Sequence, residues 1–177
     1  MIQYKAFIAS SLDGFIARSN GSIDWLTSDA YKLDNNDFGY SAFMQEIDCI
    51  VMGRVTFEKV LSFEPYPFES TPVYVYTGNI DYKFESKYPI FIFNGTLESL
   101  TMTLEKKQFK TAYVDGGKLI QHFINERMLN EITITRIPIL IGSGLPLFGN
   151  LTKDQKLEHI QTMAYPNGFV QSKYQLT

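Results

Sequence analysis

Two glycines that end an apolar strand and begin a helix are the residues of this chain best suited to chemistry. The segment reads Val114-Asp-Gly-Gly-Lys-Leu-Ile-Gln-His-Phe-Ile124, and its apolar residues recur four apart, as on one buried stripe of a helix. Glycine permits a sharp turn and lets a ligand reach main-chain N–H groups that a side chain would shield. Because a first helical turn has unpaired N–H donors and the positive end of the helix dipole, such a corner favours a phosphate. A glycine pair is also common at such junctions as plain structure, so both interpretations stay open.

The other reactive side chains form none of the common active sites. His122 and His159 have no partner cysteines and no H-E-x-x-H spacing, so the sequence predicts no metal site. Cys49 lies in an apolar run, where a small buried side chain is expected. The chain has no G-x-S-x-G elbow and no G-x-x-x-x-G-K-[ST] loop, and the segment 142–147 begins like a dinucleotide fingerprint but lacks its third glycine. Such a chain suits a cofactor that brings its own reactivity, such as a nicotinamide hydride donor.

Strand-like and helix-like runs alternate along most of the chain and would place the glycine corner at the end of a strand. Strands are predicted over 2–10, 49–52, 73–77, 89–93, 111–114 and 131–137, and helices within 37–46, from Gly53, over 96–109 and after the glycine pair. Residues between the first strand and the first helix read as a long loop. The last strands read as an antiparallel hairpin that turns at Pro166-Asn167-Gly168. Repeated strand–helix–strand units predict an α/β fold with a mostly parallel sheet covered on both faces.

Length and composition predict one soluble domain that spans residues 1–177. The hydrophobic fraction of 45% and the charged fraction of 20% are ordinary for a globular protein. A net charge of −3 with interspersed signs makes nucleic acid an unfavourable partner. No apolar run approaches the roughly 20 residues that span a bilayer. The first residues have no signal-peptide pattern, so we expect a cytoplasmic protein without membrane contact.

Four segments in order resemble the dihydrofolate reductase superfamily. They are similar above all to the branch that contains the reductase domain of bifunctional riboflavin-biosynthesis enzymes (the RibD C-terminal domain) and its stand-alone relatives. The segments are Ala9-Ser-Ser-Leu-Asp-Gly-Phe-Ile-Ala17, Ile23-Asp-Trp-Leu26, Val51-Met-Gly-Arg-Val-Thr-Phe-Glu58, and Val114-Asp-Gly-Gly-Lys118 continuing to Pro138-Ile-Leu-Ile-Gly-Ser-Gly-Leu-Pro-Leu-Phe148. Their order and spacing agree over nearly the whole chain.

The resemblance implies a dihydrofolate reductase-like three-layer α/β/α domain with a mixed sheet of about eight strands and NADPH as the hydride donor. By position in the family motifs, Gly53, Arg54 and Thr56 would meet phosphates, and Arg54 would pair with the 2′-phosphate. Thr77 would line the adenosine side. The pyrophosphate would lie against Gly116, Gly117, Lys118 and Leu119, and the nicotinamide against Ala9 and Ile16.

The substrate side departs from the family pattern and leaves alternatives open. Folate reductases use one acidic residue on the first helix to hold the pterin and assist protonation. Counting back from Gly53 favours Asp37 for this catalytic role, although an aspartate at a helix start is also a good N-cap. Asp13 matches an aspartate of the riboflavin branch and would contact substrate, or it only forms an Asp-Gly turn. Trp25 would border the substrate, or it only closes the core.

The leading hypothesis is an NADPH-dependent reductase that acts on a C=N or C=O bond of a small, pterin- or pyrimidine-like substrate. The chain has no H-x-E with P-C-x-x-C, so the deaminase half of the bifunctional enzymes is absent from it. The alternative is a nucleotide-binding protein that retains the fold without turnover. The resemblance also suggests a homodimer, with the apolar segment 137–148 as one contact.

Overall fold

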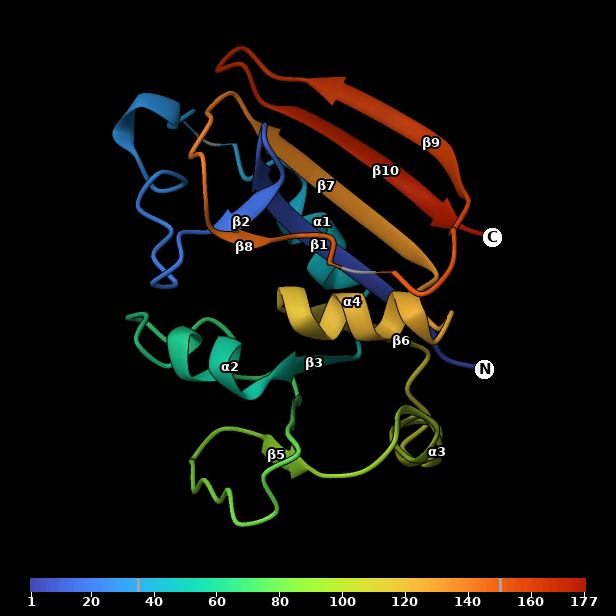
Figure 1. Ribbon diagram of the computed structural model, residues 1–177. Coiled ribbons are helices and arrows are strands. Elements are labelled where there is room, and N and C mark those ends of the chain that lie inside the picture. The colour runs from blue at the N-terminus through green and yellow to red at the C-terminus, as the bar shows by residue number, and fades with distance from the viewer. Residues whose placement is uncertain (35, 150) are drawn as a thin grey trace.

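An eight-stranded mixed sheet organises the chain in the computed structural model, which describes residues 1–34, 36–149 and 151–177 (Figure 1). The strand order is β5-β4-β3-β6-β1-β7-β10-β9. The six strands from β5 to β7 are parallel neighbours, whereas β10 is antiparallel to both β7 and β9. These strands are β1 (Gln3–Ser11), β3 (Cys49–Gly53), β4 (Val73–Tyr76), β5 (Ile90–Phe93), β6 (Thr111–Asp115), β7 (Glu131–Ile137), β9 (Leu157–Ala164) and β10 (Val170–Leu176).

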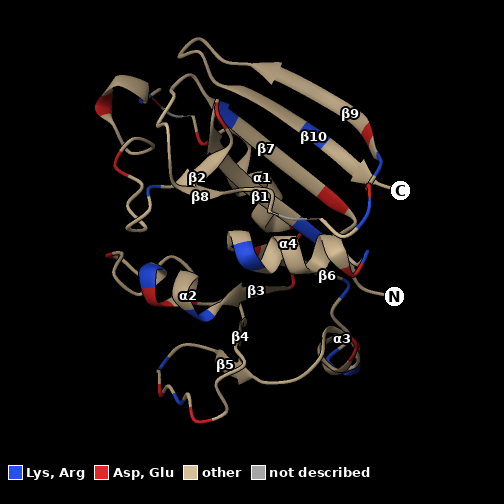
Figure 2. Ribbon diagram, viewed as in Figure 1, with Lys and Arg blue, Asp and Glu red and all other residues tan. Residues whose placement is uncertain are grey.

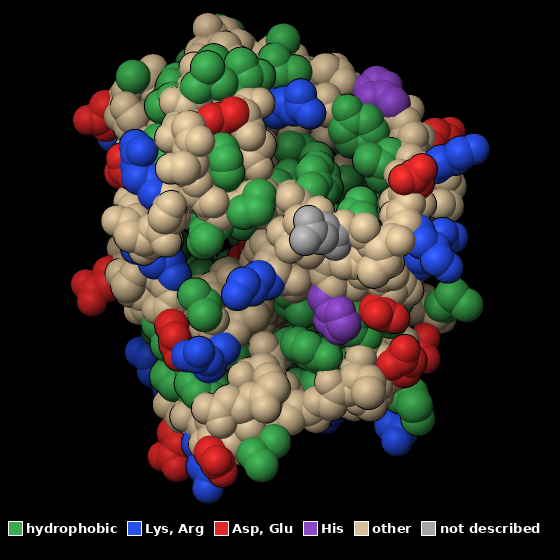
Figure 3. Space-filling model, viewed as in Figure 1, with side chains coloured by type: hydrophobic (Ala, Val, Ile, Leu, Met, Phe, Trp, Pro, Cys, Tyr) green, Lys and Arg blue, Asp and Glu red, His purple; other side chains and the backbone are tan. Residues whose placement is uncertain are grey.

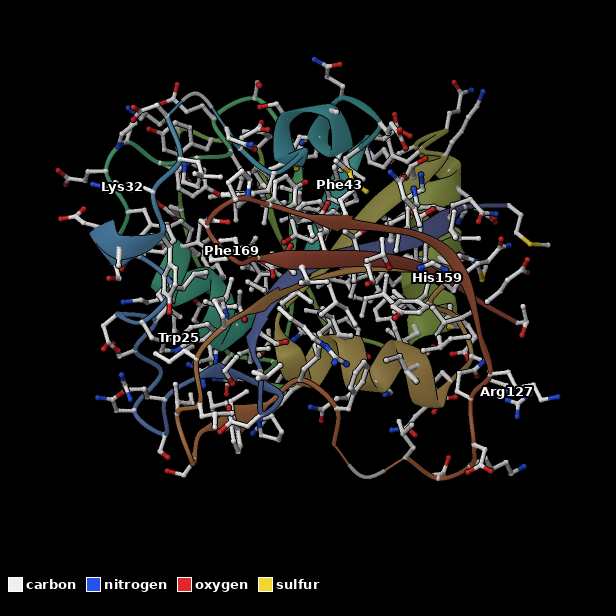
Figure 4. The ribbon with its side chains drawn as sticks, turned by 90° about the horizontal axis from the view of Figure 1, so that it is seen from above. Trp25, Lys32, Phe43, Arg127, His159 and Phe169 are labelled. Carbon is white, nitrogen blue, oxygen red and sulfur yellow. The ribbon has the colours of Figure 1, made fainter. Side chains whose placement is uncertain are left out.

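Helices cover both faces of this sheet and make a three-layer α/β/α domain. Helices α1 (Tyr40–Gln45) and α2 (Arg54–Val60) pack in one hydrophobic cluster, and α3 (Leu97–Lys106) and α4 (Gly117–Asn125) pack in another. Seen from above, α1 and α4 lie on opposite sides of the strands (Figure 4). The predicted dihydrofolate reductase-like architecture is therefore confirmed.

The central strands are apolar on both faces because helices cover them on both sides. In β3, Cys49 to Met52 are all 0% exposed, as expected for a strand in the middle of a covered sheet. Burial also raises the pKa of the Cys49 thiol to about 12, so the buried structural role predicted for this cysteine is confirmed.

The long loop predicted after β1 contains an element that the sequence did not reveal. Strand β2 (Phe15–Ala17) pairs with β8 (Leu145–Pro146), which lies in the segment 142–147 that begins like a dinucleotide fingerprint. A hydrogen bond from Leu147 N to Gly14 O continues this two-stranded strap, and Leu147 is 2% exposed. The strap is too short for a period-two pattern to show in the sequence. It brings the loops after β1 and β7 together beside the start of α4 (Figure 1).

Candidate functional site

The glycine corner after β6 presents free main-chain donors, as the sequence predicted. The first hydrogen bond within α4 runs from Ile120 N to Gly116 O at 2.9 Å, so the N–H groups of the three preceding residues have no partner inside the helix. Figure 2 shows positive charge at the start of α4. Lys118 is exposed, whereas the Leu119 side chain is 6% exposed and belongs to the core. Leu119 can therefore serve a ligand only through its main chain. The peptide bond between Gly116 and Gly117 is trans, since the cis bond of the described chain joins Glu64 to Pro65.

The second glycine corner joins β3 to α2 and is open to solvent. Gly53 has an ordinary extended conformation (φ −69°, ψ 151°), and no described atom lies within 4 Å of the position its Cβ would take. Neither the backbone nor the packing of the described chain therefore requires glycine at position 53. The glycine leaves room for a ligand to approach the main chain at this corner.

The two corners meet at one edge of the sheet, and together they form what we call the recess. Strands β3 and β6 are neighbours, with Met52 opposite Asp115, so their carboxyl ends meet at the same edge of the sheet. There the Thr56 side chain lies directly against Gly116, which has a φ of +98°. Gly53, Thr56 and the first turn of α4 thus face a common space suited to a pyrophosphate.

Arg54 lies at the outer side of this recess and is already oriented. Its Nη1 donates to Glu58 Oε1 at 2.8 Å, one helical turn along α2, and its guanidinium lies 5.8 Å from the centre of the Tyr82 ring. The other guanidinium N–H groups remain available for a phosphate.

Thr77, also predicted to meet the cofactor, is 8% exposed and accepts a hydrogen bond from Asn79 N at 3.1 Å, so its side chain holds the turn after β4.

Ala9 and Ile16, the two residues assigned to the nicotinamide, have different surroundings: Ile16 lies against the glycine corner, and Ala9 lines a neighbouring cleft. Ile16 belongs to β2, and its Cδ1 is 2.5 Å from where a Cβ of Gly117 would be. The β2–β8 strap therefore covers one side of the glycine corner. Ala9 lies near the carboxyl end of β1 and lines the neighbouring cleft.

A cleft of about 510 Å³ opens beside the recess, between α1, the 3₁₀ helix η1 (Asp29–Tyr31) and the carboxyl ends of β1 and β7. Its size is that of a small-molecule site. In Figure 4, Lys32, Phe169 and Trp25 lie at this same end of the sheet. Most residues of the walls are apolar or aromatic, and the polar ones are a minority. The lining residues are Phe7, Ile8, Ala9, Leu26, Thr27, Ser28, Tyr31, Lys32, Leu33, Asn36, Asp37, Phe38, Tyr40, Thr135, Ile137 and Phe169.

Asp37 lines the cleft rim and also caps α1. Its carboxylate accepts hydrogen bonds from Gly39 N at 3.0 Å and Ser41 N at 2.8 Å. The Ser41 side chain, followed by these N–H groups, lowers the pKa of Asp37. The hydrogen bonds of Asp37 are therefore those expected of a helix cap. Because its pKa is lowered, Asp37 is a carboxylate at neutral pH. Its catalytic role stays a prediction, better suited to holding a positive or N–H-bearing group than to releasing a proton.

Asp13 ties two loops together at the same edge. Its carboxylate accepts from Ser11 Oγ at 2.6 Å, from Gly142 N at 2.8 Å and from Ile141 N at 3.1 Å. The Ser11 hydroxyl and these two N–H groups lower the pKa of Asp13. The side chain is thus occupied within the protein, and a contact with substrate stays a prediction.

Trp25 lies one layer behind the cleft. It is 3% exposed and packs with Ile137 and Phe169, both of which line the cleft. Its indole N–H has no hydrogen-bond partner among the described residues. Trp25 is therefore packed as a core residue. A ligand in the cleft would contact Ile137 and Phe169, and Trp25 would lie behind them.

Asp115 was missed by the sequence interpretation, although it directly precedes Gly116 at the end of β6. Burial raises its pKa to about 6, against the opposing effects of the Gly116 N–H and the Tyr113 hydroxyl. Burial, and after it the charge of Asp115, raises the pKa of Tyr40, a residue of the cleft wall, so the charge of Asp115 acts on the cleft. An acid at the carboxyl end of a central strand, beside the glycine pair, was the signal that could have identified it.

Within residues 1–34, 36–149 and 151–177, no three His, Cys, Asp or Glu side chains form a group that could hold a metal ion. In the same residues, no helix has the length and apolar character needed to cross a membrane.

The sheet order, the two glycine corners and the adjoining cleft define a protein with a reductase-like fold. Residues 4–171 match the model of the RibD C-terminal domain, and the chain belongs to that family. It is 39% identical over 153 residues to the uncharacterised protein YwjB of Bacillus subtilis (strain 168), covering 85% of each chain. A crystal structure from Shewanella sp. PV-4, of a protein provisionally named for riboflavin biosynthesis, is 37% identical with a TM-score of 0.91 and covers 99% of both chains.

More distant structures share the fold alone. One is a diaminohydroxyphosphoribosylaminopyrimidine deaminase/5-amino-6-(5-phosphoribosylamino)uracil reductase of Thermotoga maritima, with 15% identity and a TM-score of 0.72 over 99% of this chain and 57% of that one. Another is dihydrofolate reductase of Enterococcus faecalis, with 17% identity and a TM-score of 0.67 over 99% of this chain and 96% of that one.

Proposed function

We propose that this protein is an NADPH-dependent reductase that acts on a C=N or C=O bond of a small heterocyclic substrate. One observation carries the proposal: the two glycine corners, with free main-chain donors suited to phosphate, and an apolar cleft lie at the same edge of the sheet, where the parallel strands end. Ligands of parallel α/β sheets bind at that edge. Membership of the RibD C-terminal domain family and the reductase-like fold support the same activity.

The residues present fit the dinucleotide. Gly53 leaves its side of the recess open, the first turn of α4 offers N–H donors to a pyrophosphate, and Arg54 retains donors for a 2′-phosphate. When bound, NADPH would supply a hydride to the substrate carbon, while the nitrogen or oxygen takes up a proton and NADP⁺ remains. The cleft walls would hold the acceptor ring against Ala9 and exclude water from it.

An acidic side chain of the protein would donate the proton to the substrate. Asp115, whose pKa is raised to about 6, is partly protonated near neutral pH, and its charge acts on Tyr40 of the cleft wall. It is therefore a better proton donor than Asp37, whose pKa is lowered. In this proposal Asp37 binds the substrate ring and Asp115 delivers the proton, directly or through the Tyr40 hydroxyl.

Titration of the purified protein with NADPH and NADH, followed by calorimetry and Trp25 emission, tests the cofactor site. Micromolar binding selective for NADPH supports the proposal, whereas binding of neither nucleotide contradicts it. Turnover is then measured with pterin, flavin-precursor and carbonyl substrates by loss of NADPH absorbance.

A second candidate function is nucleotide binding without turnover. The observation that favours it is the engagement of the Asp37 carboxylate as a helix cap, which leaves no unoccupied acid at the position expected from folate reductases. Tight NADPH binding, combined with no turnover and no effect of Asp115→Asn on any property of the complex, would favour this alternative.

We also propose a cytoplasmic homodimer. The segment 137–148 divides into core residues and exposed ones: Ile137 and Leu147 are buried, whereas Leu140, Leu145 and Phe148 are exposed. Apolar side chains gather on the face that carries α4 and the C-terminal hairpin (Figure 3). Light scattering of the wild type and of Phe148→Asp tests this proposal, which predicts a dimer that the charged variant dissociates.

A further inference from the structure

The cleft next to the cofactor recess has almost no means of holding a phosphate. Among the described residues that line it, Lys32 is the one basic side chain. Lys32 is 74% exposed and forms an ion pair with Asp29, so its charge is already balanced outside the cleft. Arg136, between the lining residues Thr135 and Ile137, points to the opposite face of β7 because side chains alternate along a strand.

The remaining charge at the cleft is negative. Asp37 is a carboxylate at the rim, and Asp115, whose charge acts on the wall residue Tyr40, adds a further negative charge when ionised. The start of α1 would otherwise offer N–H donors to an anion. The Asp37 carboxylate already accepts hydrogen bonds from Gly39 N and Ser41 N, so this end of the helix is neutralised from within.

The shape and lining of the cleft favour flat rings. Phe7, Tyr31, Phe38, Tyr40 and Phe169 supply aromatic walls around about 510 Å³, a volume that accommodates a one- or two-ring heterocycle. Phe38 is held in place on this wall: its φ is +56°, and its carbonyl accepts from Gln171 Nε2 at 3.0 Å. A residue kept in this uncommon conformation by its surroundings is typical of a functional site.

We infer that the cleft selects an unphosphorylated planar heterocycle, neutral or cationic, and rejects a ring that carries a phosphate. This inference rests on the proposed reductase function and names its substrate class. The inferred substrate class differs from that of the Thermotoga maritima enzyme, which is named for a phosphoribosylamino substrate. A phosphate on such a substrate would be repelled by the Asp37 carboxylate and would find no basic side chain besides Lys32 among the described cleft residues.

A matched pair of ligands tests the selection. 5-Amino-6-(ribosylamino)uracil, with and without its 5-phosphate, is titrated into wild-type protein with and without saturating NADPH, together with pterin and 2,4-diaminopyrimidine as further unphosphorylated rings. Calorimetry gives the affinity, and Trp25 emission reports the cleft because Ile137 and Phe169 lie between the indole and the ligand. We expect the unphosphorylated compound to bind at least about tenfold more tightly, a difference of about 1.4 kcal/mol.

Two variants assign the cause. Asp37→Asn removes the charge and keeps one acceptor oxygen for the N–H groups of Gly39 and Ser41, so it should reduce the discrimination against phosphate at least about threefold, with circular dichroism to check that the fold is retained. Lys32→Ala should change neither affinity by more than about twofold, as befits an exposed lysine in a surface ion pair. An unchanged ratio in Asp37→Asn overturns the part given to Asp37, and a selective loss of the phosphorylated ligand in Lys32→Ala reveals a phosphate site that the inference denies.

Equal or tighter binding of the phosphorylated compound overturns the inference, as does failure of every unphosphorylated ring to bind. The same preparations are titrated with NADPH alone. NADPH binding without ring binding contradicts the substrate inference only, whereas ring binding without NADPH binding contradicts the proposed reductase function only.

Discussion

The Thr56 side chain occupies the position that a Cβ of Gly116 would need. These residues are 60 positions apart in sequence and belong to different corners, one after β3 and one after β6. Their contact fixes the start of α2 against the start of α4, so the two corners form one rigid recess. The glycine at 116 is therefore required by the fold itself, whatever ligand the recess holds.

Gly116→Ala should destabilise the protein by more than about 2 kcal/mol, because alanine is strained at this positive φ and its methyl group collides with Thr56. Urea unfolding monitored by circular dichroism measures the loss. In a Thr56→Ala background the steric part should disappear and the conformational part remain. A Gly116→Ala variant as stable as the wild type would show that the corner is not rigid.

Gly53→Ala is the cleaner test of the cofactor site. The fold should tolerate it, since no described atom lies near the new methyl group and the backbone is ordinary, but NADPH should bind about tenfold more weakly, or by about 1.4 kcal/mol. Gly78→Ala, equally free of neighbours, is the matched control. Gly117→Val is a poorer test because its side chain would strike Ile16. Unchanged NADPH affinity in Gly53→Ala would place the phosphates elsewhere.

Arg54→Ala should weaken NADPH about 10- to 100-fold, the usual value of a charged hydrogen bond, and NADH by no more than about threefold. The difference arises because Arg54 has donors left for a 2′-phosphate after pairing with Glu58. Lys59→Ala removes a positive charge from the same helix and serves as the control. Equal losses for both nucleotides would remove Arg54 from 2′-phosphate recognition.

The sequence predicted the architecture well because its signals are local. Burial on both faces makes β3 a continuous apolar run, and the alternation in β7 predicted its observed span, Glu131–Ile137. The glycine corner after β6 was also predictable as a strand-to-helix junction, since strand, glycines and helix are contiguous in the chain.

The substrate side could not be predicted in the same way because its properties arise from contacts distant in sequence. Asp37 is close to a helix start, yet only the hydrogen bonds from Gly39 and Ser41 reveal how it is engaged. The raised pKa of Asp115 depends on the burial that surrounds it in the fold, and strand β2 depends on pairing with β8 more than a hundred residues later.

Asp13→Ala should release the loop after β7 from the loop after β1. The amides of Ile141 and Gly142, which donate to Asp13, should then exchange with deuterium faster at neutral pH. In the wild type, the lowered pKa of Asp13 keeps this contact intact at neutral pH and loses it only as the pH falls through that pKa. Asp24→Ala, which removes the partner of Arg18, should leave both amides unchanged. If the amides of Ile141 and Gly142 exchange at the same rate in Asp13→Ala as in the wild type, Asp13 does not hold the two loops together.

Asp115 should make the protein less stable as the pH rises from about 4 to about 6. Its folded-state pKa of about 6 lies above the ordinary value of 3.8, so the folded state binds more protons than the unfolded state in this window, and stability falls as they are released. The loss is at most about 3 kcal/mol. Asp115→Asn should remove it and be the more stable protein at pH 7, as urea unfolding across this range would measure. Glu126→Gln is a surface control. If the Asp115→Asn and wild-type stabilities run parallel with pH, Asp115 titrates normally and loses its place as the proton donor.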